Sequence, residues 1–171
     1  PMHCIVCIEN VALADNFSLG DPGIELSMIA DVKGYISYNG VYVPYYRQER
    51  SYSCGEASLR MLFAYYGLNV SEWMIGVVAN WNESYGTYNL DLVRAAHFSI
   101  LSRAKLDPDL RGYPGRPIGF PAFHKWQLSI DDLKRLIDMG YPVIVLTRYS
   151  RRGYGHFSVV KGYIDDIGAL I

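Results

Sequence analysis

The stretch "QERSYSCGEASLRMLFAYYG", residues 48–67, decides the fold because it places a cysteine at the start of an amphipathic helix. Apolar side chains recur at helical spacing after the cysteine, at Leu59, Leu62, Phe63 and Tyr66. Ser53 and Glu56 have the spacing of a capping box, in which each side chain would bond the backbone amide of the other residue. Gly67 suits the position just past a helix end. The pattern predicts a helix that begins at Cys54.

The position of Cys54 favours a nucleophilic role. A helix N-terminus stabilises negative charge, so a thiolate is favoured there. A nucleophile also needs a base, and the best placed is His156, which follows a glycine-rich turn at the start of a predicted strand. Gln48 lies six residues before Cys54 and carries an amide that can stabilise an oxyanion, with the Cys54 N–H as the second donor. The competing interpretation is a cysteine that only packs in the core.

The other histidines are weaker partners for the cysteine. His97 lies within a predicted helix, where it would cover apolar surface. His124 lies in a proline-containing stretch, residues 103–125, which the sequence predicts to be a long loop of the kind that often binds ligands. His3 precedes the pair Cys4 and Cys7, a C-x-x-C without the further ligands that a zinc site needs. We therefore expect no metal and no other cofactor.

Composition limits the class of protein. The chain has 171 residues, half of them hydrophobic, which fits one domain with a substantial core. Its net charge of −1 favours neither nucleic acid nor an anionic membrane as a partner. The sequence holds no apolar run of the roughly 18 residues that a membrane span requires, and "PMHCIVCIEN" lacks the basic start of a signal peptide. These absences predict a cytoplasmic location; the oligomeric state stays open.

The remaining pattern predicts an α+β fold. Three further helices are expected in residues 71–81, 89–101 and 129–140, with Ser71 and Ser129 as N-caps. The β-branched run 141–149 and the segment 156–164 predict two antiparallel strands, the first covered on both faces. "CIVCI", residues 4–8, is typical of a buried strand. Asn39 and Gly40 predict a hairpin turn.

Four blocks of this sequence resemble the C39 and C39-like cysteine peptidases, which have a papain-like fold. "VPYYRQERSYSCGEASLRMLFAYYG" resembles the family's nucleophile motif, and "GHFSVVKGYIDD" its histidine block. Between them, "YGTYNLDLVRAAHF" and "SIDDLKRLIDMGYPVIVLTRY" resemble the second helical block and the helix-Gly-x-Pro-strand block. The resemblance covers about residues 41–166 in the family's order.

The resemblance implies Cys54 as nucleophile, His156 as general base and Gln48 as oxyanion donor. It implies hydrolysis of a peptide or small-protein substrate through a thioester, and relatives fused to transporters cut leader peptides after a double glycine. The family orients its histidine with an Asp that is followed by Pro, and no Asp-Pro follows His156 here. Asp165 and Asp166 fall in a predicted turn and are poor substitutes.

The missing acid leaves several expectations open. Residues 41–171 are expected to form a peptidase domain that lacks part of its C-terminal end, or one in which another group orients the histidine. Residues 1–40 would be an N-terminal extension of strand and hairpin pieces outside the resemblance. The alternatives to a peptidase are a catalytically weakened peptide-binding module of the same fold, in which Arg148, Arg151 and Arg152 could hold an acidic peptide, and an acyl transferase that uses the same cysteine and histidine.

Overall fold

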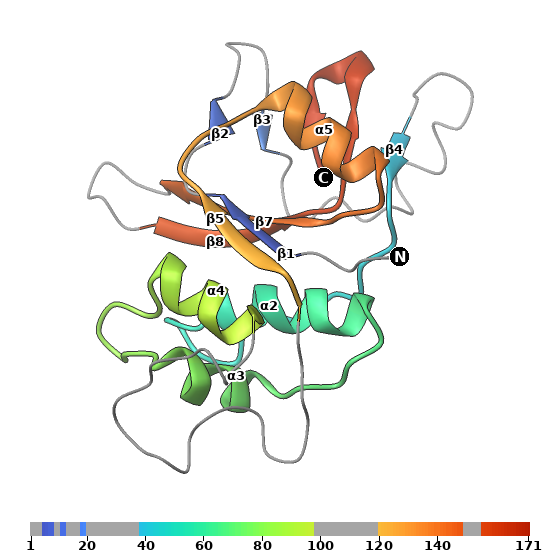
Figure 1. Ribbon diagram of the computed structural model, residues 1–171. Coiled ribbons are helices and arrows are strands. Elements are labelled where there is room, and N and C mark those ends of the chain that lie inside the picture. The colour runs from blue at the N-terminus through green and yellow to red at the C-terminus, as the bar shows by residue number, and fades with distance from the viewer. Residues whose placement is uncertain (1–4, 9–10, 13–17, 20–37, 98–119, 149–154) are drawn as a thin grey trace.

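The central sheet lies between three helices on one side and a single helix on the other. The computed structural model describes residues 5–8, 11–12, 18–19, 38–97, 120–148 and 155–171. Four helices are present in these residues: α2 (Cys54–Tyr65), α3 (Glu72–Ala79), α4 (Asn89–His97) and α5 (Ile130–Asp138). Figure 1 shows α2, α3 and α4 on one side of the central sheet and α5 on the other. The four predicted helices and the α+β class are confirmed.

The predicted helix start at Cys54 and the two predicted serine caps are confirmed, whereas the predicted capping box is wrong. Ser71 caps α3 by accepting a hydrogen bond from the Met74 amide at 3.2 Å, and Ser129 caps α5 by accepting from the Asp132 amide at 3.1 Å. Ser53, at the start of α2, makes no such capping bond. Its hydroxyl instead serves the turn before the helix, so the predicted capping box does not form.

The central sheet has the strand order β5-β1-β7-β8. Its strands are β5 (Ala122–Lys125), β1 (Ile5–Ile8), β7 (Val143–Arg148) and β8 (Gly155–Val160). β1 runs parallel to both β5 and β7, whereas β7 and β8 form the predicted antiparallel pair, with Thr147 opposite His156. The sheet is therefore mixed.

A second sheet has the order β3-β10-β9-β4, built from β3 (Ser18–Leu19), β10 (Ala169–Leu170), β9 (Gly162–Ile164) and β4 (Tyr38–Gly40). Two short strands, β2 (Val11–Ala12) and β6 (Leu128–Ser129), form a separate pair, and the 3₁₀ turn η2 (Asp165–Ile167) joins β9 to β10. The predicted hairpin turn is wrong, because Asn39 and Gly40 lie inside β4 and pair with β9. A Cβ atom on Gly40 would lie 2.7 Å from the Lys161 carbonyl, so the glycine allows close contact between strands.

The predicted loop over residues 103–125 is wrong at its end, because 122–125 form β5. Residues 103–119 of that stretch lie outside the described residues, as do Cys4, Arg151 and Arg152. A strand at 5–8 is confirmed, and it lies between β5 and β7 although it precedes the resemblance.

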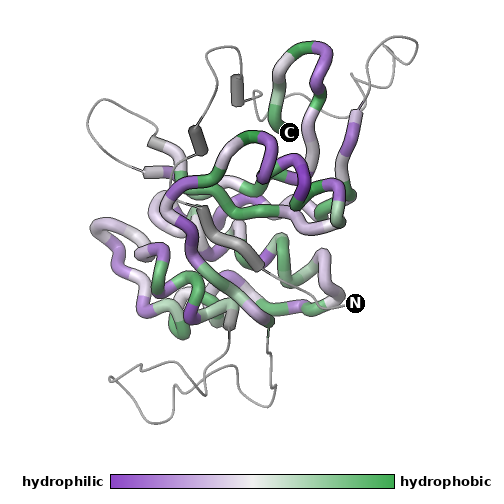
Figure 2. The backbone as a smooth tube through the Cα atoms, turned by 45° about the horizontal axis from the view of Figure 1, so that its top comes forward, coloured by the Kyte–Doolittle hydropathy of each residue, from purple (hydrophilic) through white to green (hydrophobic). Residues whose placement is uncertain are grey.

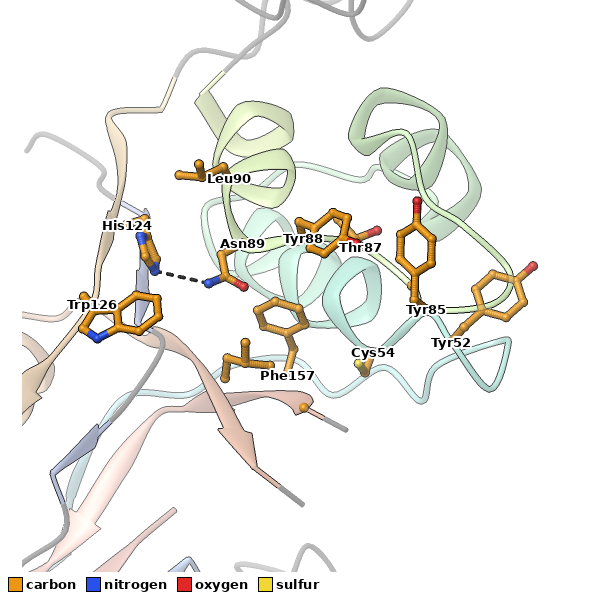
Figure 3. Close-up of a pocket in the computed structure, with 13 residues that line it drawn as sticks. Tyr52, Cys54, Tyr85, Thr87, Tyr88, Asn89, Leu90, His124, Trp126 and Phe157 are labelled. Carbon is orange, nitrogen blue, oxygen red and sulfur yellow. Dashed lines mark hydrogen bonds between the residues drawn. The ribbon is translucent and has the colours of Figure 1, made fainter. Parts of the chain in front are cut away.

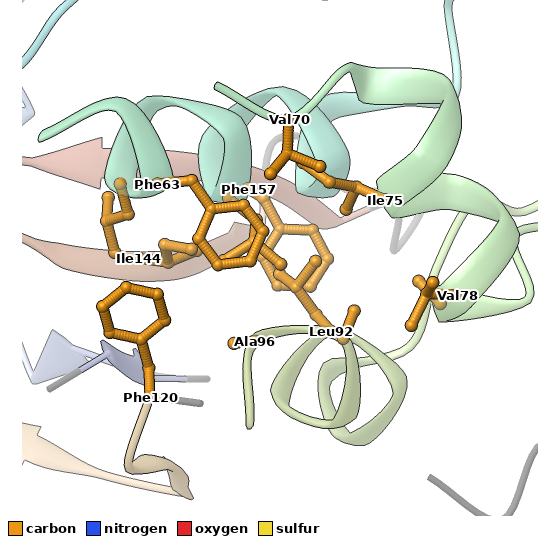
Figure 4. Close-up of a cluster of buried hydrophobic side chains, with 13 residues drawn as sticks. Phe63, Val70, Ile75, Val78, Leu92, Ala96, Phe120, Ile144 and Phe157 are labelled. Atoms are coloured by element: carbon orange, nitrogen blue, oxygen red, sulfur yellow. The ribbon is translucent and has the colours of Figure 1, made fainter. Parts of the chain in front are cut away.

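Two hydrophobic clusters fill the spaces on either side of the central sheet. Figure 4 shows the first cluster, in which Phe63, Leu92 and Phe157 pack between α2, α4 and the sheet. The second joins α5 to the opposite face through side chains that include Leu133 and Val145. In Figure 2 the hydrophobic parts of the tube follow the interior strands, while α5 alternates between hydrophobic and hydrophilic residues. Burial of β7 on both faces, predicted from its β-branched run, is confirmed.

Candidate active site

Cys54 is the first residue of α2 and lies against β8. Burial raises the pKa of its thiol, and the nearby Glu56 carboxylate raises it further. Three backbone N–H groups act in the opposite direction by hydrogen-bonding the sulfur, those of Phe157, Gly55 and Cys54 itself. The net pKa is raised above the ordinary value, so the isolated thiol favours its neutral form.

The Phe157 amide, which lowers the pKa of the thiol, locates the sulfur relative to His156. This amide belongs to the peptide bond that joins His156 to Phe157, so the sulfur lies close to the backbone of the predicted base. Burial lowers the pKa of His156, which keeps the half-buried imidazole neutral at pH 7. The His156 carbonyl accepts a hydrogen bond from the Thr147 hydroxyl at 3.3 Å.

The side chain of His156 starts from the opposite face of β8 to that of Phe157. Strand side chains alternate, and Phe157 packs into the cluster on the helix side of the sheet. β8 ends the strand order of its sheet in the described part of the chain. The structure therefore brings Cys54 close to the backbone beside His156, while neither the His156 nor the Gln48 side chain is among the described residues that line the hollow next to Cys54.

Gln48 lies in the turn that leads into α2. Its side-chain Nε2 donates to the Arg50 carbonyl at 2.6 Å. The Ser53 hydroxyl donates to the same carbonyl at 2.9 Å and accepts from the Arg50 amide at 3.1 Å. These bonds fix the turn and use one hydrogen of the Gln48 amide, and the amide nitrogen carries a second.

The two candidate acids after His156 lie away from Cys54. Asp165 and Asp166 are exposed in η2. The carboxylate of Asp165 forms an ion pair with Lys134 of α5, on the other side of the central sheet from α2. The expectation that these residues are poor orienting acids therefore agrees with their placement.

A hollow of about 530 Å³ adjoins Cys54. Figure 3 shows its lining, which comes from the start of α2, from the segment that leads into α4, from β5 and from the β7–β8 pair. His124, predicted to lie in a loop, is on β5 and reaches this hollow, where its Nε2 lies 3.3 Å from Nδ2 of Asn89. The sequence placed residues 85–90 at the start of the second helical block but did not reveal that they line this hollow, because that depends on contacts with β5 and β8.

Glu56 is a second feature that the sequence did not reveal. Its side chain is fully buried, one oxygen accepts a hydrogen bond from the Thr87 hydroxyl, and the other has no hydrogen-bond partner among the described residues. Burial raises the pKa of this carboxyl, and the buried Glu72 raises it further. Thr87 lines the hollow, so this bond ties the wall of the hollow to the first turn of α2.

Comparison with known protein families shows which family this chain belongs to. The model of the Peptidase_C39 like family matches residues 41–170. The chain belongs to the Peptidase_C39 like family. The match runs from the segment before Gln48 through β10, so α2 with Cys54 and β8 with His156 both lie within it. This membership confirms the resemblance inferred from the four sequence blocks.

The other comparisons add no relatives. No curated protein and no solved structure matches this chain. In the part of the chain that the structure describes, no helix combines the length and the apolar composition needed to cross a membrane. Membership of the C39-like family indicates a peptidase-related protein.

Proposed function

We propose that this protein is a cysteine peptidase that hydrolyses a peptide bond through a thioester at Cys54. The observation that carries the proposal is the position of the thiol, which lies at the N-terminus of α2 and packs against β8 close to the amide that follows His156. Family membership supports the same reaction class. The open hollow beside Cys54 provides room for a substrate.

In the proposed reaction, His156 acts as the general base. The imidazole takes the thiol proton while the sulfur forms a bond to the carbonyl carbon of the substrate. The oxyanion accepts hydrogen bonds from the Cys54 N–H and from the Gln48 amide. The C–N bond then breaks, and the imidazolium gives its proton to the departing amine. Water next attacks the thioester carbonyl while the imidazole takes its proton. The C–S bond then breaks, the acid product leaves, and the imidazolium returns the proton to the sulfur.

The electrostatics favour a neutral pair in the resting protein. Burial raises the pKa of the Cys54 thiol and lowers that of the His156 imidazole, so both changes oppose a permanent thiolate–imidazolium pair. The imidazole is then in its basic form at pH 7, as a general base must be. The backbone N–H groups at the start of α2 stabilise negative charge once the proton has moved.

A peptide-binding module without turnover is the second candidate function. The raised pKa of the Cys54 thiol and the bond that holds the Gln48 amide on the Arg50 carbonyl favour it, because both would slow acylation. The two functions share one site and differ in whether a covalent intermediate forms.

Digestion of a diverse peptide mixture, followed by mass spectrometry, tests the proposal. Wild-type protein is expected to cut peptides, and Cys54→Ser to lose activity by on the order of 10³-fold or more. A mass increase on the peptide that carries Cys54, trapped by rapid acid quenching, would mark the thioester. Cleavage that survives in Cys54→Ser would contradict the proposal. Products that carry an added amine in place of water would identify acyl transfer instead.

A further inference from the structure

The hollow beside Cys54 has a wall that is almost free of charge. Most of its lining side chains are aromatic or aliphatic: Tyr52, Tyr85, Tyr88, Leu90, Trp126, Leu146 and Phe157. Among the residues that the structure describes, no Asp, Glu, Lys or Arg side chain lines it, and His124 is its one basic group. A charged substrate side chain that entered would lose its hydration without gaining a counter-charge.

Large apolar side chains are also unusually exposed around this hollow. The exposed fractions are 60% for Tyr85, 62% for Tyr88, 69% for Leu90 and 60% for Trp126. Single exposed apolar residues are common on proteins, but a group of them around one concavity is typical of a binding site. The rings of Tyr85 and Tyr88 lie 5.1 Å apart and form a continuous aromatic surface.

The backbone of the aromatic wall is held in place before any substrate binds. Gly86 exchanges two backbone hydrogen bonds with Asn82, at 2.7 and 2.9 Å. Its φ is +79°, and a Cβ atom at this position would lie 2.7 Å from the Tyr52 carbonyl oxygen, so both the conformation and the space require glycine. Thr87 adds the bond to the buried Glu56. A wall fixed in this way loses little conformational entropy on binding.

The hollow extends away from the thiol toward β5. Figure 3 shows Phe157 between Cys54 and the pair His124 and Trp126, with Tyr85 and Tyr52 on the other side of Cys54. His124 and Trp126 meet edge to face, with ring centroids 6.3 Å apart. A substrate whose carbonyl lies at Cys54 could therefore extend a neighbouring side chain past Phe157 toward Trp126.

We propose that this hollow is a specificity pocket for one large uncharged side chain, aromatic or aliphatic, on a residue close to the scissile bond. This assignment rests on the proposed peptidase function for the meaning of the scissile bond. It differs from the double-glycine specificity of the transporter-fused relatives, because glycine has no side chain to fill the pocket. The substrate class is therefore peptides with an apolar residue beside the cut.

A matched peptide series tests the pocket. Peptides that wild-type protein cuts are resynthesised with Phe, Leu, Gly, Asp or Lys at each position flanking the cut, and kcat/KM is measured. At one position, Phe and Leu are expected to exceed Gly, Asp and Lys by on the order of 10- to 100-fold. Equal rates at every position, or a preference for Gly or for a charge, would overturn the pocket.

Variants locate the preference in the structure. Tyr88→Ala and Trp126→Ala are expected to reduce the ratio of the Phe to the Gly rate, since each removes aromatic surface from the lining. Tyr42→Ala and Tyr45→Ala are matched controls, because these tyrosines are 79% and 76% exposed and do not line the hollow. If the control variants change the ratio as much as the pocket variants, the assignment is wrong.

A binding measurement separates failure of the pocket from failure of the proposed function. Fluorescently labelled peptides of one fixed sequence, with Phe, Leu, Gly, Asp or Lys at a single position, are titrated into Cys54→Ser protein whether or not wild type cuts them, and binding is followed by fluorescence anisotropy. Preference for Phe and Leu in binding without any cleavage by wild type would uphold the pocket and reject the peptidase. Cleavage without an apolar preference would uphold the peptidase and reject the pocket. Neither cleavage nor selective binding would reject both.

Discussion

The two sides of the central sheet differ in how many polar side chains they bury. On the α5 side, the helix has a serine cap, acidic residues in its first turn and a core of aliphatic side chains together with Tyr163. On the side of α2 and α3, the interior also holds polar groups. The four buried polar or charged residues of the described chain all lie in or beside these two helices: Ser53, Glu56, Ser58 and Glu72.

This difference indicates that the α5 side serves stability, whereas the α2 side also serves the candidate site. Burying a carboxyl costs free energy unless its oxygens are well bonded, and Glu56 leaves one oxygen without a described partner. That cost falls on the helix that carries Cys54 and adjoins the hollow. The α5 side carries no comparable cost in the described residues, so it serves chiefly to stabilise the fold.

Truncation of the two cores should show that both sides are equally necessary for stability. Phe63 and Leu133 are fully buried on opposite sides of the sheet. Phe63→Ala is expected to lower the free energy of unfolding by about 3–5 kcal/mol and Leu133→Ala by about 2–5 kcal/mol. Urea denaturation measures both. A loss below about 1 kcal/mol on one side would break the comparison, because that side would not share the cooperative core.

The pH dependence of stability should differ when Glu56 is replaced. Because the folded protein raises the pKa of this carboxyl, its contribution is fully present below the ordinary Glu value of about 4.3 and is lost as pH rises through the folded value. Glu56→Gln removes this loss while it keeps an acceptor for Thr87. Across that pH window, the free energy of unfolding of the variant should rise relative to that of wild type by up to about 1.4 kcal/mol per pH unit.

Urea denaturation from pH 4 upward, with Glu83→Gln as an exposed control, measures the effect. The control should follow wild type throughout. Parallel curves for Glu56→Gln and wild type would mean that Glu56 titrates as an ordinary surface carboxyl.

The two serines should act on different properties. Ser129→Ala removes the cap of α5 and is expected to cost about 1 kcal/mol of stability. Ser53→Ala removes the bonds to Arg50 and is expected to change the alkylation rate of Cys54, because the turn before the thiol loses its fixed geometry. Urea denaturation and thiol alkylation are measured on both variants. An alkylation change of the same size in Ser129→Ala would show that the effect is global.

The smallest expected effects concern one arginine ion pair on each side of the sheet. Arg135 is 75% exposed and pairs with Asp132 at 3.2 Å, so Arg135→Ala should change stability by less than about 0.5 kcal/mol. Arg60 pairs with Glu49 at 3.0 Å and lies over the Tyr46 ring at 4.3 Å, so Arg60→Ala should cost about 1 kcal/mol. Thermal unfolding in low and high salt measures the stability of both variants. A larger loss of stability for Arg135→Ala than for Arg60→Ala would contradict the expected ranking.

Local sequence patterns correctly predicted the elements that are determined by residues close to one another in the sequence. The spacing of Leu133 and Ile137 and the serine before them specify α5 without help from the rest of the chain. The capping box failed at α2 because Ser53 bonds Arg50 instead and Glu56 bonds Thr87, 31 residues away. No local pattern reports a partner at that distance.

Strand pairing shows the same limit. The placement of β1 between β5 and β7 joins residue 6 to residues 123 and 143, and Asn39 pairs with Tyr163. At the site, the helix position of Cys54 could be predicted because it depends on neighbouring residues. The wall from Tyr85 to Tyr88 and the role of Glu56 could not, because they depend on contacts between distant segments.

The most direct test of the central claim is the rate of Cys54 alkylation by iodoacetamide at pH 5–9 in wild type, His156→Ala and His124→Ala. We predict that wild type at pH 7 reacts at least about tenfold faster than His156→Ala, because the imidazole accepts the thiol proton. His124→Ala should match wild type. The wild-type advantage should disappear only below the ordinary histidine pKa of about 6.5, since burial lowers the pKa of His156. Equal rates in wild type and His156→Ala would show that Cys54 and His156 do not cooperate.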